Sequence, residues 1–246
     1  MFQKTTALHR AMLASLRPSL GGGSEALSIS EQIAMQLADE IVNERFEPNE
    51  RLQEIGISER YKVSRGPVRE ALRILENAGL VTIAPRRGAI VTQLSAKEVA
   101  DVFDIRAVLS GLGARRMAET RSKDDIDMLQ RQCAALKKLA AKKGPKAAAD
   151  YVDAVVEFGL SISEASGNER LNSIVTLLFH QTLRYSRLGL SSPERRAQSC
   201  ANWVELVDHI VAGRAVEAEQ TARQLVEQSK VHAIRLLREA EARDAG

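Results

Sequence analysis

The order of apolar and polar positions divides the chain into a mixed segment and a long helical segment. Between residues 28 and 94, three stretches repeat apolar residues every three to four positions, as helices do. Two short runs near 80–83 and 89–93 have the composition of strands and flank a basic turn. Helix, short helix, tight turn, helix and β-hairpin together predict a winged helix-turn-helix.

The three helices of this segment carry signals at their ends and on their inner faces. We expect the first to open at Ser30 and the second to bury Ile55 and Ile57. Ser64 is the expected N-cap of the third helix, residues 65–77. The inner face of that helix is formed by four apolar residues, Val68, Ala71, Leu72 and Leu75.

From residue 95 onward the apolar repeats are all helical. Ser95 and Glu98 have the spacing of a capping box, which marks a helix start. Helices are expected over 96–120, 123–142, 146–166, 169–188, 194–212 and 214–243. Six helices with short loops predict an antiparallel bundle with a central cavity or seam. The chain is therefore expected to be mainly α, with a flexible basic N-terminal arm (1–27), a winged helix-turn-helix (28–94) and an all-α six-helix domain (95–243).

Composition excludes several classes of protein. Apolar residues make up 44% of the 246 residues and charged residues 27%, as in ordinary soluble proteins. No apolar run approaches the roughly 18 residues of a membrane-spanning helix, so we expect no membrane partner. The two cysteines, Cys133 and Cys200, are far apart and match no metal spacing. They suit a reducing compartment, and we expect the protein in the cytoplasm.

Positive charge is concentrated in one part of the chain. The net charge is only +3, but residues 60–94 contain seven basic and two acidic residues. A basic segment in an otherwise balanced chain is typical of contact with a phosphate backbone. A solvated face would have the same composition, so charge alone leaves both interpretations open.

The start of the third helix has the residue types that contact DNA. In a helix-turn-helix, the second helix of the motif enters the major groove with its N-terminal end. Ser64 can bond a phosphate there, and Gly66 lets the backbone come close. Arg65 and Arg69 are four residues apart, so they share a face and either can contact guanine. Arg73, one turn later, is expected at a phosphate or in an ion pair with a nearby glutamate.

The turn between the two strands is basic as well. Arg86 and Arg87 suit the minor groove or flanking phosphates, and Gly88 permits the turn. These arginines could instead only keep a helical hairpin in solution. The combination of N-cap, paired arginines and basic hairpin favours DNA binding over that alternative.

Two parts of the chain resemble one family of bacterial regulators. The resemblance to the DNA-binding domain of the GntR family covers residues 28–94 and rests on VSRGPVREAL, GLV and PRRGAIV. The helical remainder is similar to the C-terminal domain of the fatty-acid-regulator (FadR, or FCD) subfamily, through DIRAVLSGLGARRMAE and FGLSISEASGNERL. The resemblance implies a homodimer that binds operator DNA and a helical domain that dimerises and binds a small metabolite. It implies DNA contacts at Ser64, Arg65, Gly66, Arg69, Arg86, Arg87 and Gly88.

Many FCD domains hold a divalent metal with an aspartate, a histidine four residues later and two histidines from later helices. By position, the corresponding residues here are Val155, Gly159, Trp203 and Leu225. None of them can ligate Zn²⁺, Ni²⁺ or Mn²⁺, so we expect no metal and no other cofactor. Three further histidines have no ligand spacing and are expected at the surface or satisfied in the core: His180, His209 and His232.

Without metal ligands, the same four positions are candidates for lining an organic ligand. Trp203 would give the cavity an aromatic wall, and Gly159 would free space beside it. Arg106 is at a position that in the family points toward the ligand region, and a buried guanidinium needs a carboxylate partner. A ligand could supply that carboxylate, or the protein could through Asp101, Asp104 or another acid.

The sequence therefore predicts a ligand-responsive transcription regulator, a repressor that binds operator DNA as a homodimer and responds to a small acidic metabolite. An effector-independent DNA-binding regulator with a filled pocket is the alternative. We expect no enzyme, because the chain shows no Ser/His/Asp or Cys/His arrangement, no phosphate-binding glycine loop and no paired carboxylates.

Overall fold

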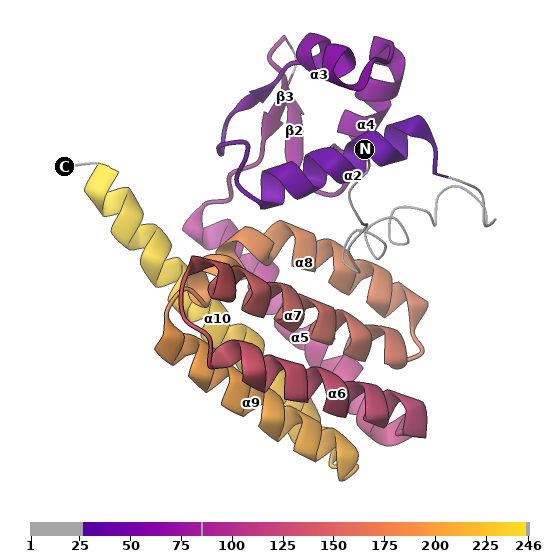
Figure 1. Ribbon diagram of the computed structural model, residues 1–246, viewed down its shortest axis with the longest axis vertical. Helices are drawn as coiled ribbons and strands as arrows, with labels where there is room; N and C mark the ends of the chain where they lie inside the picture. The colour runs from indigo at the N-terminus through magenta and orange to yellow at the C-terminus, as the bar shows by residue number, and fades with distance from the viewer. Residues whose placement is uncertain (1–26, 85, 245–246) are drawn as a thin grey trace. The chain divides into compact units, whose positions relative to one another are not determined.

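The computed structural model describes residues 27–84 and 86–244, and the chain divides at Leu94 and Ser95 into two compact units. The expected N-terminal arm falls almost entirely on residues 1–26, outside the described residues. The N-terminal unit contains α2 (Ile29–Val42), β1 (Arg51–Leu52), α3 (Glu54–Tyr61), α4 (Arg65–Asn77), β2 (Val81–Ala84) and β3 (Gly88–Val91) (Figure 1).

Helix α2 begins earlier than the sequence predicts. Its N-cap is Ser28, whose hydroxyl accepts the Glu31 N–H at 3.2 Å while the Glu31 carboxylate accepts the Ser28 N–H at 2.8 Å. This reciprocal capping box satisfies donors that have no partner within the helix. Ser30 therefore lies inside α2, and the prediction that it opens the helix is wrong.

A sharp turn joins α3 to α4 and completes the helix-turn-helix. After Tyr61, Lys62 adopts a left-handed backbone with φ of 54°, and Ser64 takes the N-cap position of α4. Ile57 is buried, but Ile55 is 50% exposed, so its predicted burial is wrong. Two residues that are two positions apart on a helix lie on different sides, and α3 buries only one side. The inner face of α4 is buried as predicted, through Val68, Ala71, Leu72 and Leu75.

A three-stranded antiparallel sheet in the order β1-β3-β2 completes the N-terminal unit. β2 and β3 form the predicted hairpin, with Val81 opposite Val91. The sequence does not predict β1, because two residues are too few to show a period and they follow a turn around Pro48. β1 pairs with β3 through Leu52 opposite Ala89, so β3 is the central strand.

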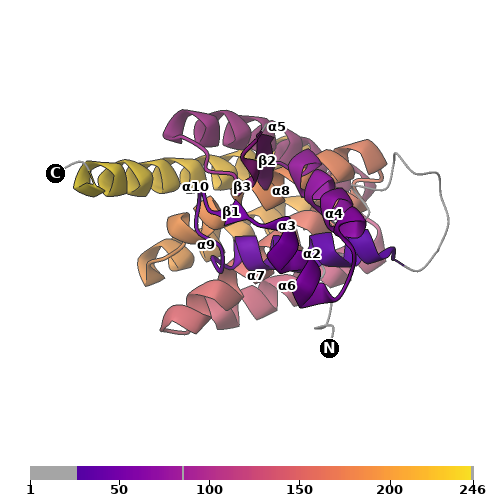
Figure 2. The ribbon, with the colours of Figure 1, turned by 90° about the horizontal axis from the view of Figure 1, so that it is seen from above.

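The C-terminal unit is helical, as predicted. It contains α5 (Ala96–Thr120), α6 (Lys123–Ala140), α7 (Pro145–Ala165), α8 (Glu169–Gly189), α9 (Pro193–Val211) and α10 (Ala215–Asp244), with bounds within two residues of the prediction. The Ser95–Glu98 capping box begins α5. α7, α8, α9 and α10 all pack on α5, α10 most extensively. Figure 2 shows α5 on the outer side of the bundle, beside α10.

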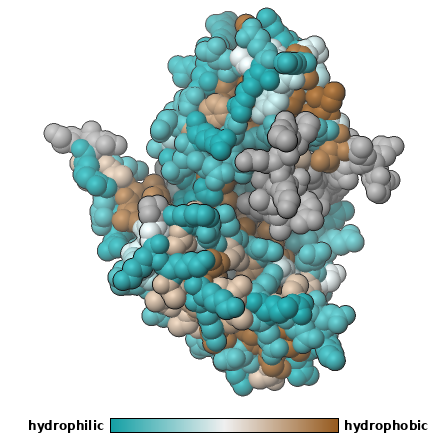
Figure 3. Space-filling view, in the orientation of Figure 1, coloured by the Kyte–Doolittle hydropathy of each residue, from teal (hydrophilic) through white to brown (hydrophobic). Residues whose placement is uncertain are grey.

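The surfaces of the two units are mainly polar. No helix in the described part of the chain is long and apolar enough to cross a membrane. In the view of Figure 3, hydrophilic side chains cover most of the surface, and apolar side chains come through in patches. One shallow groove lies on the C-terminal part of α10 and is lined by Val231, Ile234, Arg235, Arg238, Glu239 and Ala242.

Candidate functional site

The N-terminal end of α4 is open to solvent and positive. Ser64, Arg65 and Gly66 are exposed, and the first turn contains no acidic residue. The Ser64 hydroxyl makes no capping hydrogen bond, so it and the first N–H groups of α4 are available to an external anion. A Cβ on Gly66 would meet only the Ser64 hydroxyl, at 4.0 Å, so packing does not require glycine there. The helix dipole adds attraction for a phosphate.

The three arginines of α4 differ in their partners. Arg69 Nε donates to Glu54 Oε2 at 3.1 Å and so connects α4 with α3. Arg73 Nη1 lies 3.6 Å from Glu70 Oε2, the ion pair that the sequence offered as one option. Both pairs are exposed and therefore weak. Arg65 pairs with no described residue, so of the three it is the most available for contact with a base edge.

One arginine of the basic segment has a structural role. Arg60 on α3 donates through Nη1 to Glu40 Oε2 at 2.8 Å, and Glu40 is buried on α2. This hydrogen bond raises the pKa of Arg60 above its ordinary value. Because a buried carboxylate is costly without a cation, Arg60 is committed to joining α3 and α2.

Arg86 and Arg87 lie exposed at the tip of the β2–β3 hairpin, the wing. Arg86 has a left-handed backbone with φ of 64°, and the Arg87 N–H donates to the Ala84 carbonyl at 3.1 Å, so the chain reverses tightly. Gly88 follows with φ of 76°, a conformation that glycine adopts without strain. Arg86 has no such freedom, and backbone strain of this kind clusters at functional sites.

Arg51 on β1 brings a further guanidinium to the wing. A Cβ built on Gly88 would lie 3.7 Å from Arg51 Nε and 3.8 Å from its Nη2. Arg51 is held there because it lies opposite Ile90 in the sheet. Sequence reasoning missed Arg51, since its position depends on β1 joining β3 and no local signal marks β1.

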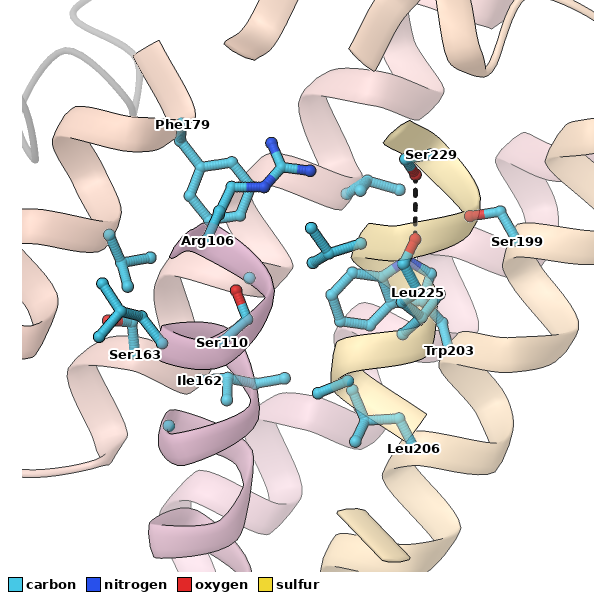
Figure 4. Close-up of a pocket in the computed structure, with 17 residues that line it drawn as sticks. Arg106, Ser110, Ile162, Ser163, Phe179, Ser199, Trp203, Leu206, Leu225 and Ser229 are labelled. Carbon is cyan, nitrogen blue, oxygen red and sulfur yellow. Dashed lines mark hydrogen bonds between the residues drawn. The ribbon is translucent and has the colours of Figure 1, made fainter. Parts of the chain in front are cut away.

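In the C-terminal unit, α5, α7, α8, α9 and α10 enclose a cavity of about 50 Å³ (Figure 4). Its wall is mainly apolar, with polar atoms from four serines, Ser110, Ser163, Ser199 and Ser229. The structure brings all five residues expected at a ligand site to this one cavity: Arg106, Val155, Gly159, Trp203 and Leu225. Sequence reasoning missed Phe179 of α8, which Figure 4 shows beside Arg106.

The Arg106 guanidinium is buried at this cavity. Its Nη1 donates to Thr182 Oγ1 and, at 3.3 Å, to Ser186 Oγ, while its Nε has no hydrogen-bond partner among the described residues. The rings of Phe103 and Phe179 have their centroids 4.3 Å and 4.9 Å from the guanidinium carbon. Burial lowers the pKa of Arg106 to about 9, so the side chain stays charged at neutral pH.

Asp101 and Asp104, which the sequence analysis names as possible partners of Arg106, form ion pairs with other residues. Asp101 pairs with Lys97 Nζ at 2.8 Å, and Asp104 pairs with Lys230 Nζ at 2.5 Å. Both acids are exposed, whereas Arg106 is buried, so the alternative of an internal pair with either acid is wrong. In the part of the chain that the structure describes, no carboxylate forms an ion pair with Arg106.

The space beside Gly159 is occupied, and the expectation that Gly159 frees room is wrong. A Cβ on Gly159 would lie 2.6 Å from Phe179 Cζ, so the Phe179 ring rests against the bare backbone of α7. The expected aromatic wall is present, because Trp203 stacks on Phe158 with centroids 4.6 Å apart and 17° between the ring planes. The remaining volume of about 50 Å³ is enough for only a few water molecules.

The positions that hold a metal in related domains offer no ligand atoms here. Val155 and Leu225 are aliphatic, Gly159 has no side chain, and the Trp203 indole nitrogen is only a donor. Across the described ranges, no group of three or more histidine, cysteine, aspartate or glutamate side chains could hold a metal ion. The residues at this cavity therefore do not fit a divalent cation.

The histidines of the described part of the chain lie away from the cavity lining. His180 is buried with Nδ1 2.7 Å from a backbone carbonyl oxygen of its own helix, as a core histidine would be. His209 Nδ1 accepts from Arg214 Nε at 2.9 Å, and His232 lies 3.3 Å from Arg235 Nη2. Each of the three histidines contacts a residue of its own neighbourhood, and no two of them lie together as metal ligands would.

Fold and sites together define a regulatory protein with a winged helix-turn-helix followed by a helical domain. The family model described as bacterial regulatory proteins, gntR family, matches residues 29–91, and the model of the FCD domain matches residues 101–228. The chain belongs to the GntR family and carries an FCD domain. Members of this family are transcriptional regulators and not enzymes, in agreement with the sequence analysis.

Curated relatives and solved structures agree with this assignment. The HTH-type transcriptional regulator YdhC of Bacillus subtilis is 35% identical over 101 residues, 41% of this chain and 45% of that protein. The gluconate operon transcriptional repressor of the same organism is 34% identical over 92 residues, 37% of each chain. The chain thus spans less than half the length of these relatives. The E. coli McbR/YncC structure shares the fold, with a TM-score of 0.72, 18% identity, and coverage of 88% of this chain and 100% of that one.

Proposed function

We propose that this protein is a transcription repressor of the cytoplasm, which binds operator DNA as a homodimer and releases it when a small acidic organic molecule binds in the FCD cavity. The DNA-binding part rests on the N-terminal unit and the ligand-binding part on the C-terminal unit. The name of one relative, a transcriptional repressor, supports repression as the direction of control.

The observation that carries the DNA-binding part is the unpaired Arg65 at the open end of α4. A guanidinium there can donate two hydrogen bonds to guanine O6 and N7 in the major groove. Arg69 is steadied by Glu54 and would contact a neighbouring base or phosphate. The exposed Arg86 and Arg87 of the wing fit flanking phosphates or the minor groove.

The observation that carries the ligand-binding part is the buried Arg106 without a carboxylate. Its Nε and the hydroxyl of Ser163 are buried polar groups with no hydrogen-bond partner among the described residues, and both residues line the cavity. A carboxylate would satisfy such donors and offset the cost of a buried charge. The apolar wall around Trp203 suits a short hydrocarbon part of the same molecule.

The size of the cavity favours a second candidate function, an effector-independent DNA-binding regulator. Typical ligand pockets have volumes of about 300–1,000 Å³. The cavity here has about 50 Å³ because Phe179 and Trp203 fill the centre of the bundle. A metabolite would have to displace the Phe179 ring, and without that movement the domain would serve only for dimerisation.

Selection of bound fragments from a random duplex library tests the DNA-binding part. We expect one sequence to be enriched and to bind about a thousandfold or more tighter than a scrambled duplex at the same salt concentration. A homodimer should enrich two half-sites related by two-fold symmetry. Equal binding of enriched and scrambled duplexes would contradict the proposal.

Tryptophan fluorescence separates the two candidates. Trp203 is the single tryptophan of the sequence and lines the cavity, so its emission reports on that place alone. A panel of small mono- and dicarboxylic acids is titrated, with the corresponding amides as matched controls. Under the first candidate, at least one acid shifts the emission, raises the melting temperature and lowers operator affinity, while its amide does not. Under the second, no acid changes any of the three.

A further inference from the structure

Helix α5 presents an apolar stripe to solvent on the side that faces away from the bundle. Ile105, Val108 and Leu112 are 53%, 50% and 38% exposed, and their spacing of three and four residues places them on one face. The opposite face of α5 packs on the helices that surround the cavity. Since α5 has an apolar stripe on each side, the outer stripe is left without a partner among the described residues.

The neighbouring helix α10 also carries an exposed apolar side chain. Lys230 of α10 is bound to Asp104 of α5, and Arg115 of α5 to Glu219 of α10, so the two helices run antiparallel and Val231 lies level with the residues just before Asp104. Val231 is 60% exposed. Val231 is thus a further exposed apolar side chain on the helix that packs most extensively against α5.

Charges of opposite sign flank the stripe. Asp101 precedes it toward the N-terminal end of α5, where its ion pair with Lys97 is exposed and therefore weak, and the exposed Arg116 follows it toward the C-terminal end. Arg115, next to Arg116, is already bound to Glu119 and Glu219. Arg116 forms no ion pair with any residue that the structure describes, so its charge is available to a partner.

We propose that this stripe, Ile105, Val108 and Leu112, binds the same stripe of a second copy of the chain, with the two α5 helices antiparallel about a two-fold axis near Val108. The proposal rests on the homodimer of the proposed function and goes further by assigning the surface. In an isologous contact, every feature on one side of the axis must find its complement at the same distance on the other side.

The stripe meets this requirement. With a rise of about 1.5 Å per residue, Ile105 lies roughly 4.5 Å before Val108 and Leu112 roughly 6 Å after it, so they face one another across the axis. Asp101 lies roughly 10 Å before Val108 and Arg116 roughly 12 Å after it, so the acid of one copy meets the arginine of the other. A different protein partner would need no such symmetry of apolar and charged positions within one helix.

Charge exchange in the full-length chain tests this pairing. Sedimentation equilibrium is measured for the wild type, Asp101→Arg, Arg116→Asp and the double variant. Each single variant places like charges in contact at two symmetric points, so we expect its dimer dissociation constant to rise about tenfold or more. In the double variant opposite charges meet again, and we expect a dissociation constant within about threefold of the wild type.

A second pair of variants tests the apolar part. Leu112→Arg should give a monomer, while Ile55→Arg, the same change at a comparably exposed residue of α3, should leave the dimer intact. Melting monitored by circular dichroism verifies that each variant is folded.

The outcomes separate this assignment from the proposed function. A wild-type dimer that binds operator DNA, combined with an unaffected Leu112→Arg dimer or a double variant weaker than both singles, overturns the α5 assignment alone. A wild type that is monomeric at tens of micromolar overturns both the assignment and the homodimer. If residues 1–26 or another protein cover the stripe instead, the charge exchange shows no rescue.

Discussion

Two buried arginines of the helical unit have opposite environments. Arg196 lies on α9, and its Nη1 donates to the carbonyl oxygens of Leu190 at 3.3 Å and Ser191 at 2.7 Å, just past the C-terminal end of α8. The negative end of the α8 dipole lies beside these two carbonyls, and a cation there stabilises it. Arg106 bonds only to hydroxyls and lies against aromatic rings. Arg196 therefore stabilises the fold, whereas Arg106 is the side chain to which the proposed acidic ligand would bind.

We expect methionine at the two positions to have contrasting effects. Arg196→Met should lower the free energy of unfolding by about 1–3 kcal/mol, because it removes the donor from the buried Leu190 carbonyl and from the partly buried Ser191 carbonyl. Arg106→Met should leave it unchanged or raise it, because a buried charge without a carboxylate is replaced by an apolar side chain. The same variant should lose every response to the acid identified by fluorescence. Denaturant titration measures the first effect, and retention of the acid response in Arg106→Met would remove Arg106 from the ligand site.

The loss of Arg65 should weaken sequence recognition. Arg65→Ala is expected to cost about 1–3 kcal/mol on the selected operator and to relax the preference at one base pair of each half-site. Arg131→Ala removes the same charge from an exposed position on α6 and serves as the control. Titration at fixed salt gives both affinities. An Arg65→Ala protein that binds as tightly as the control would exclude a base contact.

At the scale of elements, the serines at helix starts divide into two kinds. Ser28 caps α2 through its hydroxyl, whereas Ser64 stands at the N-cap of α4 and makes no such bond. We expect Ser28→Ala to lower the free energy of unfolding by about 1 kcal/mol and Ser64→Ala to leave it unchanged. Ser64→Ala should weaken operator binding, whereas Ser28→Ala should leave operator affinity unchanged. Equal destabilisation by the two substitutions would show that Ser64 is a structural cap.

Helices were predictable from the sequence because caps and periodicity are local. Ser95 and Ser122 mark the N-terminal ends of α5 and α6 in the sequence, and both serines are N-caps in the structure. β1 was not predictable, because a two-residue strand exists only through its pairing with β3. Arg51, which depends on that pairing, was missed for the same reason, and Ile55 was misjudged because α3 is too short to show which side is buried.

The cavity was predictable only in part. Resemblance to the FCD domain gave the positions of Val155, Gly159 and Trp203 around one centre, and the structure brings them together. The contents of that centre depend on contacts between helices far apart in the chain. No local pattern indicates that the Phe179 ring covers Gly159 or that the acids near Arg106 face away from it.

At the scale of the whole molecule, the purified protein should contain no stoichiometric transition metal. The four positions that would supply ligands carry no imidazole or carboxylate, and no group of three or more ligating side chains lies elsewhere in the described ranges. Elemental analysis after removal of any affinity tag should give far less than one Zn, Ni or Mn per chain. A chelator should leave both the melting temperature and operator affinity unchanged, and a drop in either would contradict this reading of the cavity.

Coupling between the two units depends on differential binding. A ligand shifts operator affinity only if it binds the DNA-competent and the released states with different affinities. The same coupling must appear in reverse, so operator DNA should weaken the binding of the acid by the same factor. A higher melting temperature in the presence of the acid shows that the acid binds, but it does not show that binding changes operator affinity.

The contact between Phe179 and the bare backbone at Gly159 has a consequence for kinetics. A cavity of about 50 Å³ cannot admit an organic acid while the ring stays in place. The acid can then enter only after the Phe179 ring has moved. The rate of that movement does not depend on the concentration of the acid. In stopped-flow experiments on Trp203 emission, the observed association rate should level off at high acid concentration. In Phe179→Ala, the observed rate should instead rise linearly with acid concentration.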